Sequence, residues 1–274
     1  MSAPFPVLAL RRLELAWVLE QCGAGDWPYP LAPAAWPADR DDETVLARAR
    51  VEDCLRARGL LEPGPAAVLL AVGAAVRDRN RQVDLVRRSA TTPCAAVALG
   101  SATEGALLWS ADHAGADVAV RPLDPAGLVP GLLALVPPRP AAPGPALEVP
   151  ATTGAAGPAG PAGPAGPAGP ATARSERERR AVEDVLTSAE AWTQIGVVAA
   201  PNEVSSVGER GDVTIKWLDG PRGRYRLRHD PGHTHDVDGR GRSGRARLVG
   251  EDAASPAVRR ELEAALRPSG RRTV

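Results

Sequence analysis

The chain has 274 residues, 44% of them hydrophobic, with 33 basic and 33 acidic side chains. This is enough for one sizeable core or two small subdomains, and the balanced charge excludes a whole-chain field that attracts nucleic acid or anionic membrane. Three widely spaced cysteines exclude a secreted disulfide scaffold.

The start of the chain does not have the pattern of an export signal. Its apolar stretch over residues 4–10 is followed, not preceded, by Arg11 and Arg12, the reverse of a signal peptide. No apolar run approaches the roughly 18 residues of a membrane-spanning helix. We therefore expect a cytoplasmic protein without membrane insertion.

The first part of the chain predicts three helices. Apolar residues recur at helical spacing over residues 10–17. A second helix runs from a capping aspartate at position 41 or 42 to Gly59, and a third opens at Pro65. The residues expected on the inward faces of these two helices are Val45, Ala49, Leu55, Val68, Leu69, Val72 and Val76.

Four segments with alternating apolar residues follow, around residues 83–85, 97–99, 107–109 and 118–120. Their short spacers favour an antiparallel meander. A helix over residues 125–135 is expected to close this half of the chain.

A stretch rich in proline, glycine and alanine comes next, over residues 137–173. It contains a Gly-Pro-Ala repeat from Gly157 to Ala171. Five such triplets are too few for a stable collagen triple helix. The composition favours a flexible linker that is partly polyproline II.

The second half has the same kinds of element. A long helix begins near Ser175 and carries an apolar face as far as Trp192. Ser255 caps a last helix with Pro256 at its first position. The strands expected between them cover residues 195–198, 213–218, 223–228 and 245–249, and the inward residues of the last helix are Val258, Leu262 and Leu266.

These elements predict an α+β protein with two pseudo-symmetric subdomains, each an antiparallel sheet packed with helices. The subdomains cover residues 1–136 and 174–268, joined by the linker at 137–173 and followed by a polar tail at 269–274.

One cluster of metal-ligating residue types is His229, His233 and His235, with two carboxylates nearby. Such residues can bind zinc, but Pro231 and Gly232 make a turn, and the loop after them is poorly suited to orient ligands. We interpret the segment as a polar hairpin loop.

No nucleophile elbow, phosphate loop or dinucleotide motif occurs, so we predict a protein that is not an enzyme and needs no cofactor. The alternative is a metal-dependent enzyme that uses the three histidines.

The strand over residues 222–228 alternates arginine with other residues. Alternation places the arginines on one face and Tyr225 with Leu227 on the other. We expect Trp217 of the preceding strand on the apolar side, which helices cover, and a basic outer side. That outer side is open to three interpretations: a solvated face, a docking surface for a protein or a nucleic-acid interface, the least favoured because charge is balanced elsewhere. The four arginines are Arg222, Arg224, Arg226 and Arg228.

An ordered set of short motifs in both halves resembles the EspG family. The first half carries Leu13-Glu-Leu with Trp17, then Pro28-Tyr-Pro-Leu31. The second half carries Gln194-Ile-Gly-Val, Trp217-Leu-Asp-Gly and Gly223-Arg-Tyr in the family's order. The resemblance covers most of the chain outside the linker.

The resemblance implies a cytosolic chaperone of actinobacterial type VII (ESX) secretion with a quasi-symmetric α+β fold. EspG proteins bind the hydrophobic helical tip of PPE proteins in PE–PPE pairs and keep these substrates soluble. The implied partner is therefore a PE/PPE-like protein, with transient contact with the secretion machinery and no nucleic acid. The partner-binding residues expected on this basis are Trp217, Arg222, Arg224, Tyr225, Arg226, Arg228, Leu262 and Leu266.

Overall fold

The structure is a computed structural model. It describes residues 6–31, 36, 41–110, 117–149, 170–199, 214–229 and 246–267, without the side chains of residues 41, 170–175, 199 and 229. The chain divides into two compact units, which are described separately. Unit 1 comprises residues 1–137, 194–214 and 253–274, and unit 2 comprises residues 138–193 and 215–252.

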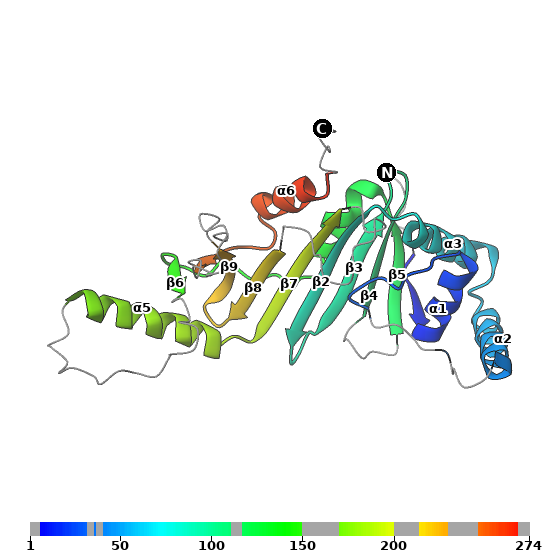
Figure 1. Cartoon of the computed structure of the whole chain (residues 1–274), viewed down its shortest axis with the longest axis horizontal. Coiled ribbons are helices and arrows are strands. Elements are labelled where there is room, and N and C mark those ends of the chain that lie inside the picture. Colours follow the sequence, from blue (N-terminus) through cyan, green and yellow to red (C-terminus); the bar gives the residue numbers. More distant parts are fainter. Residues whose placement is uncertain are drawn as a thin grey trace, which may run out of the picture. The chain divides into compact units, whose positions relative to one another are not determined.

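Unit 1 contains antiparallel strands in the order β1-β5-β4-β3-β2-β7. Figure 1 shows the run from β5 to β7. Because β2 pairs with β3, β3 with β4 and β4 with β5, the predicted meander is confirmed. The strand β1, which pairs with β5, lies where the first helix was expected to begin. With four residues, it is too short to show the alternation of apolar and polar residues that marks a strand. The bounds are β1 (Leu8–Arg11), β2 (Arg81–Ser89), β3 (Cys94–Gly100), β4 (Gly105–Ser110), β5 (Asp117–Leu123) and β7 (Ala191–Ala199). Of β7, only residues 194–199 belong to this unit.

The helices of unit 1 agree with the predicted helices to within a few residues. They are α1 (Arg12–Gln21), α2 (Asp41–Ala57), α3 (Pro63–Arg77), α4 (Leu128–Leu133), which a short 3-10 turn η1 (Pro125–Gly127) precedes, and α6 (Pro256–Ala265). Gly59 ends the turn after α2 with a φ of 68°, the left-handed conformation expected there. The hydroxyl of Ser255 accepts a hydrogen bond from the Ala257 N–H, which confirms the predicted cap of α6.

The inward face predicted for α2 is wrong in part. Leu55 is buried, but Val45 and Ala49 are exposed. The second buried apolar residue is Val51, one turn before Leu55. The α2 helix packs mainly on α1, so its buried stripe is narrow and the rest of its apolar residues face outward.

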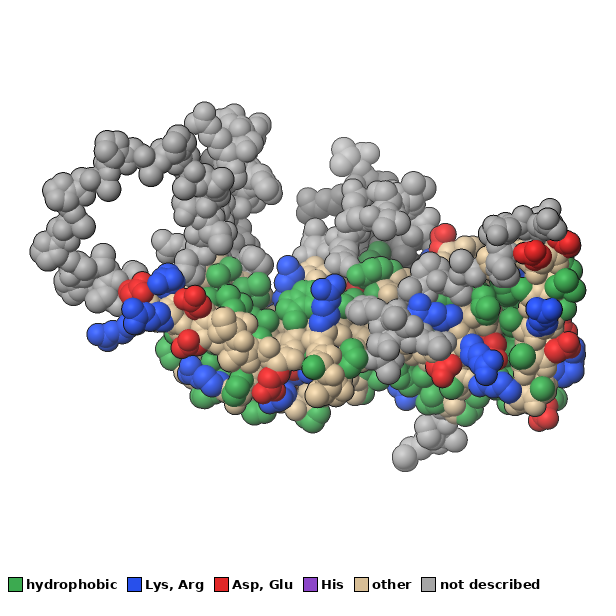
Figure 2. Space-filling model, turned by 90° about the horizontal axis from the view of Figure 1, so that it is seen from below, with side chains coloured by type: hydrophobic (Ala, Val, Ile, Leu, Met, Phe, Trp, Pro, Cys, Tyr) green, Lys and Arg blue, Asp and Glu red, His purple; other side chains and the backbone are tan. Residues whose placement is uncertain are grey.

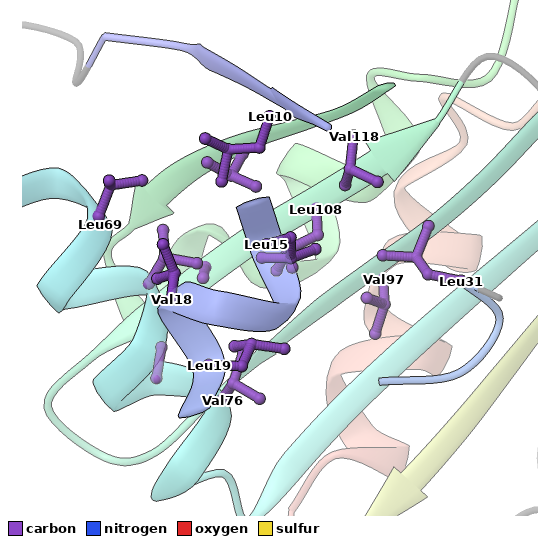
Figure 3. Close-up of a cluster of buried hydrophobic side chains, with 14 of the residues drawn as sticks. Leu10, Leu15, Val18, Leu19, Leu31, Leu69, Val76, Val97, Leu108 and Val118 are labelled. Atoms are coloured by element: carbon purple, nitrogen blue, oxygen red, sulfur yellow. The ribbon is translucent and has the colours of Figure 1, made fainter. Parts of the chain in front are cut away.

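The core of unit 1 lies between α1, α3 and one face of the sheet (Figure 3). Leu15 and Val18 of α1 meet Leu69 of α3 and Leu108 and Val118 of the sheet. All five are buried, and each contributes on the order of 1.5–3 kcal/mol through apolar burial. The predicted inward residues of α3 are confirmed, since Val68, Leu69, Val72 and Val76 are all buried.

The three cysteines differ in exposure and therefore in expected reactivity. Burial raises the pKa of the Cys94 thiol to about 11 and also raises the pKa of Cys22, whereas Cys54 is exposed on α2. Because the thiolate is the nucleophile, we expect iodoacetamide at pH 8 to modify Cys54 first and Cys94 last. A mass-spectrometric time course checks this order, and equal rates for Cys54 and Cys94 in the native protein would contradict it.

Unit 2 contains the strands β8 (Thr214–Gly220, from residue 215 on), β9 (Gly223–His229), β10 (Ala246–Gly250) and β6 (Leu147–Val149), ordered β8-β9-β10-β6. The helix α5 (Pro170–Thr187) covers one face of this sheet, where its Val182 and Val185 pack with Tyr225 and Leu248. The helix ends before Trp192, which belongs to β7, so the apolar face predicted as far as that residue is too long.

The first part of the predicted linker contains structured residues. The strand β6 pairs with β10, and residues 138–142 form hydrogen bonds with β9. Residues 150–169, which hold most of the Gly-Pro-Ala repeat, lie outside the described residues. The α+β class with antiparallel strand pairing is confirmed, while the two subdomains with a sheet each, their boundaries and the pseudo-symmetry stay predictions.

No helix in the described part of the chain is both long enough and apolar enough to span a lipid bilayer.

Candidate functional site

The candidate site is the hairpin of β8 and β9 in unit 2. A two-residue turn, Pro221–Arg222, joins the strands, and Gly220 pairs with Gly223. Gly223 has a φ of 116°, a conformation that glycine adopts most readily. Because the turn has only two residues, it fixes the register of the whole hairpin.

The register places Trp217 opposite Arg226, and Asp219 opposite Arg224. Side chains of directly paired residues lie on the same face of a sheet. Trp217 therefore shares a face with the arginines, and the prediction that it lies on the side of Tyr225 is wrong. The alternation of side chains between the two faces was predicted correctly within each strand. The register that the turn imposes between the two strands was not.

Arg224 and Asp219 form a buried ion pair on that face. The Arg224 Nε donates to Asp219 Oδ1 at 2.6 Å and its Nη2 to Asp219 Oδ2 at 2.9 Å. The two side chains are 0% and 1% exposed. The guanidinium also lies 5.2 Å from the ring centroid of Trp217, a favourable cation–π distance. Arg224 is thus neutralised inside the fold.

The carboxylate of Glu251 connects the other polar side chains of this face. Its carboxylate accepts hydrogen bonds from Trp217 Nε1 at 3.1 Å, from Arg226 Nη1 at 3.3 Å and from Arg228 Nη2 at 2.8 Å. Glu251 and Arg226 are buried, while the side chain of Arg228 is half exposed. We call Trp217, Asp219, Arg224, Arg226, Arg228 and Glu251 the hairpin cluster.

The predicted basic outer face is therefore wrong. Arg224 and Arg226 are buried and paired with carboxylates, and only Arg222 and Arg228 of the four arginines are exposed. The described side chains on the face in Figure 2 show basic and acidic groups interspersed. Neither observation favours a nucleic-acid interface, which needs a continuous basic surface.

The apolar residues of the expected partner site are core residues. Trp217 and Tyr225 are buried in unit 2. Leu262 and Leu266, at α6 in unit 1, are buried as well, which confirms the inward face predicted for that helix. None of these four side chains is available to a partner unless the fold rearranges.

The histidine loop falls largely outside the described residues. His229 ends β9, but its side chain is not described, and His233 and His235 lie beyond the described range. Among the residues that are described, no group of three His, Cys, Asp or Glu side chains could hold a metal ion.

Sequence reasoning missed a segment that packs beside the hairpin turn, residues 138–142, which we call the strap. Arg224 N–H donates to the carbonyl of Pro140 at 2.8 Å, and Ala142 N–H donates to the carbonyl of Arg224 at 3.0 Å. Arg139 forms an ion pair with Glu190. Its proline-rich composition favoured a linker, and no sequence pattern marks such backbone pairing.

The hairpin is thus a rigid support that presents two exposed arginines, Arg222 and Arg228. A guanidinium group can bind a carboxylate of a partner in a directional way, and Glu251 holds that of Arg228 in place. The described groups of the cluster are engaged with one another through ion pairs and hydrogen bonds.

The sequence of the chain matches the family model of the EspG family (ESX-1 EspG) over residues 12–238. No curated protein matches it. The matched range begins at α1 and includes the β8–β9 hairpin with most of the hairpin cluster. Because the match spans well over half of the chain, the protein belongs to the EspG family, a family associated with type VII secretion.

Proposed function

We propose that the protein is a cytosolic chaperone that binds a PE/PPE-like substrate of type VII secretion and keeps it soluble. The observation that carries this proposal is membership of the EspG family, which is not a known enzyme family. An exposed apolar helix end on a substrate favours aggregation, and covering it with a stoichiometric partner prevents this. No chemical turnover is needed for such a role.

The exposure of the hairpin residues divides the predicted site into two groups. Arg222 and Arg228 are exposed and contact the substrate directly in this proposal. The buried residues hold the hairpin and α6 in place and act through them: Trp217, Arg224, Tyr225, Arg226, Leu262 and Leu266. Because Glu251 restricts Arg228, less side-chain entropy is lost when that arginine binds.

The proposal is tested by purifying the tagged full-length chain from its native cells and identifying the proteins that remain bound. We expect a stable, stoichiometric complex with a helical protein encoded beside a type VII secretion system. Recovery of the chain alone, or only of proteins unrelated to secretion, would contradict the proposal.

The role of the hairpin is tested with the variant Arg222→Glu and the purified substrate. Reversing an exposed charge at the rim of an interface mainly slows association, and we expect binding about tenfold weaker. The matched control is Arg88→Glu, which reverses an exposed charge on β2 in unit 1. Titration calorimetry measures both affinities, and equal affinities would remove Arg222 from the proposed contact.

A further inference from the structure

The outward face of α2 carries apolar side chains that the described part of the fold does not cover. Val45 is 61% exposed and Leu46 is 56% exposed. The helix packs mainly on α1 and buries Val51 and Leu55, so these outward residues take no part in the core. Neighbouring exposed apolar residues on a stable helix indicate an interaction surface.

Two charged residues flank this surface along one line of the helix. Asp42 lies four residues before Leu46, and Arg50 lies four residues after it. Residues at this spacing share a helix face, and each charge is about 6 Å from Leu46 along the axis. Both Asp42 and Arg50 are exposed.

Other arginines of α2 have partners within the chain. Arg48 pairs with Glu20, and Arg56 pairs with Glu52 and Asp53. Among the residues that the structure describes, no ion pair involves Asp42 or Arg50. Along its outward side α2 therefore carries an acidic, an apolar and a basic residue in that order, and neither charge is paired with another described residue.

We propose that this face binds a second copy of the chain, with the two α2 helices antiparallel about a two-fold axis at Leu46. Leu46 then meets Leu46 of the second copy. Asp42 lies opposite Arg50 of the second copy, and the same ion pair forms again on the other side of the axis. Val45 and Ala49 extend the apolar contact along its edge.

The order of the charges is what favours a second copy over an unrelated partner. When two copies of a helix that carries an acidic, an apolar and a basic residue in this order lie antiparallel, each acidic residue faces a basic one. A two-fold axis requires such self-complementarity. The antiparallel arrangement also places the opposite ends of the two helix dipoles side by side. One helix per subunit falls short of the roughly 800 Å² per partner of a standard interface, so the dimer is weak and depends on concentration.

The test is sedimentation velocity of the full-length chain between about 1 and about 300 µM. We expect the dimer fraction to rise over this range, and Leu46→Glu to weaken association at least about tenfold, since the change occurs twice in the contact. Asp42→Arg and Arg50→Asp should each weaken it, and the double variant should restore it. The control is Leu70→Glu on α3, where Leu70 is 63% exposed and association should not change.

Three outcomes would overturn the proposal: a monomer at every concentration, unchanged association of Leu46→Glu, or a double variant no better than the single variants. Crosslinking gives a second readout that does not depend on affinity. Leu46→Cys should form a disulfide-linked dimer under mild oxidation. The exposed Cys54 lies about 12 Å along the axis from Leu46, so the unmodified chain should not crosslink. A crosslink through Cys54 but not through position 46 would contradict the proposed axis.

Discussion

Replacing Asp219 by alanine is expected to lower the free energy of unfolding by about 3–5 kcal/mol. The side chain of Arg224 is fully buried, and Asp219 holds it through two charge-assisted hydrogen bonds of 2.6 and 2.9 Å. Without the carboxylate, a guanidinium stays buried without its counter-charge, which is costly in a medium of low polarity. Urea denaturation followed by tryptophan fluorescence measures the loss.

The control for this variant is a surface ion pair of the same unit. Glu148 lies 3.7 Å from Arg247, and both side chains are about half exposed. Because water screens such pairs, Glu148→Ala should cost no more than about 1 kcal/mol. Similar losses for the two variants would show that the buried pair does not stabilise the fold as its geometry implies.

A double variant separates the cost of an unpaired charge from the value of the pair. Replacing Asp219 and Arg224 together with apolar residues of similar size removes both charges, and buried pairs exchanged in this way are often neutral for stability. We expect Asp219→Leu with Arg224→Met to recover most of the stability lost in Asp219→Ala. If the double variant is less stable than the single one, the contact of Arg224 with Trp217 contributes more than the charge balance.

Local patterns were sufficient to predict most of the elements. The strands β2 to β5 follow from alternating apolar residues with short spacers, and Ser255 with Pro256 marks the start of α6. These signals are local because a strand repeats every two residues and a helix cap lies within one turn. The strands β1 and β6 escaped prediction because each is too short to show a period.

The candidate site was predicted less well because its charges are balanced by distant residues. Alternation within β9 correctly grouped its arginines, but the partner of Arg226 and Arg228 is Glu251, more than twenty residues later in the sequence. The helical spacing of apolar residues in α2 likewise predicted that Val45 faces inward. Only the packing of the helix on α1 decides which of its sides is buried. Sequence periodicity shows that residues share a face and does not show what covers that face.

Replacing Gly223 by alanine is expected to destabilise the protein by about 2–5 kcal/mol, the sum of two effects. A φ of 116° disfavours any residue with a Cβ, by roughly 1–2 kcal/mol. A Cβ at this position also lies 2.7 Å from the carbonyl oxygen of Pro140, and such overpacking costs about 1–3 kcal/mol. That carbonyl accepts the hydrogen bond from Arg224 N–H, so the strap must shift and lose it.

Gly144→Ala is the matched control because Gly144 has a φ of 104° and no atom within 4 Å of an added Cβ. It should show the backbone cost alone, and the difference between the variants measures the packing of the strap on the hairpin. Thermal unfolding by circular dichroism gives both values. Equal losses would mean that the strap does not hold the turn. A larger loss in Gly223→Ala, together with weaker substrate binding, would show that the exposed Arg222 beside this glycine depends on the strap for its position.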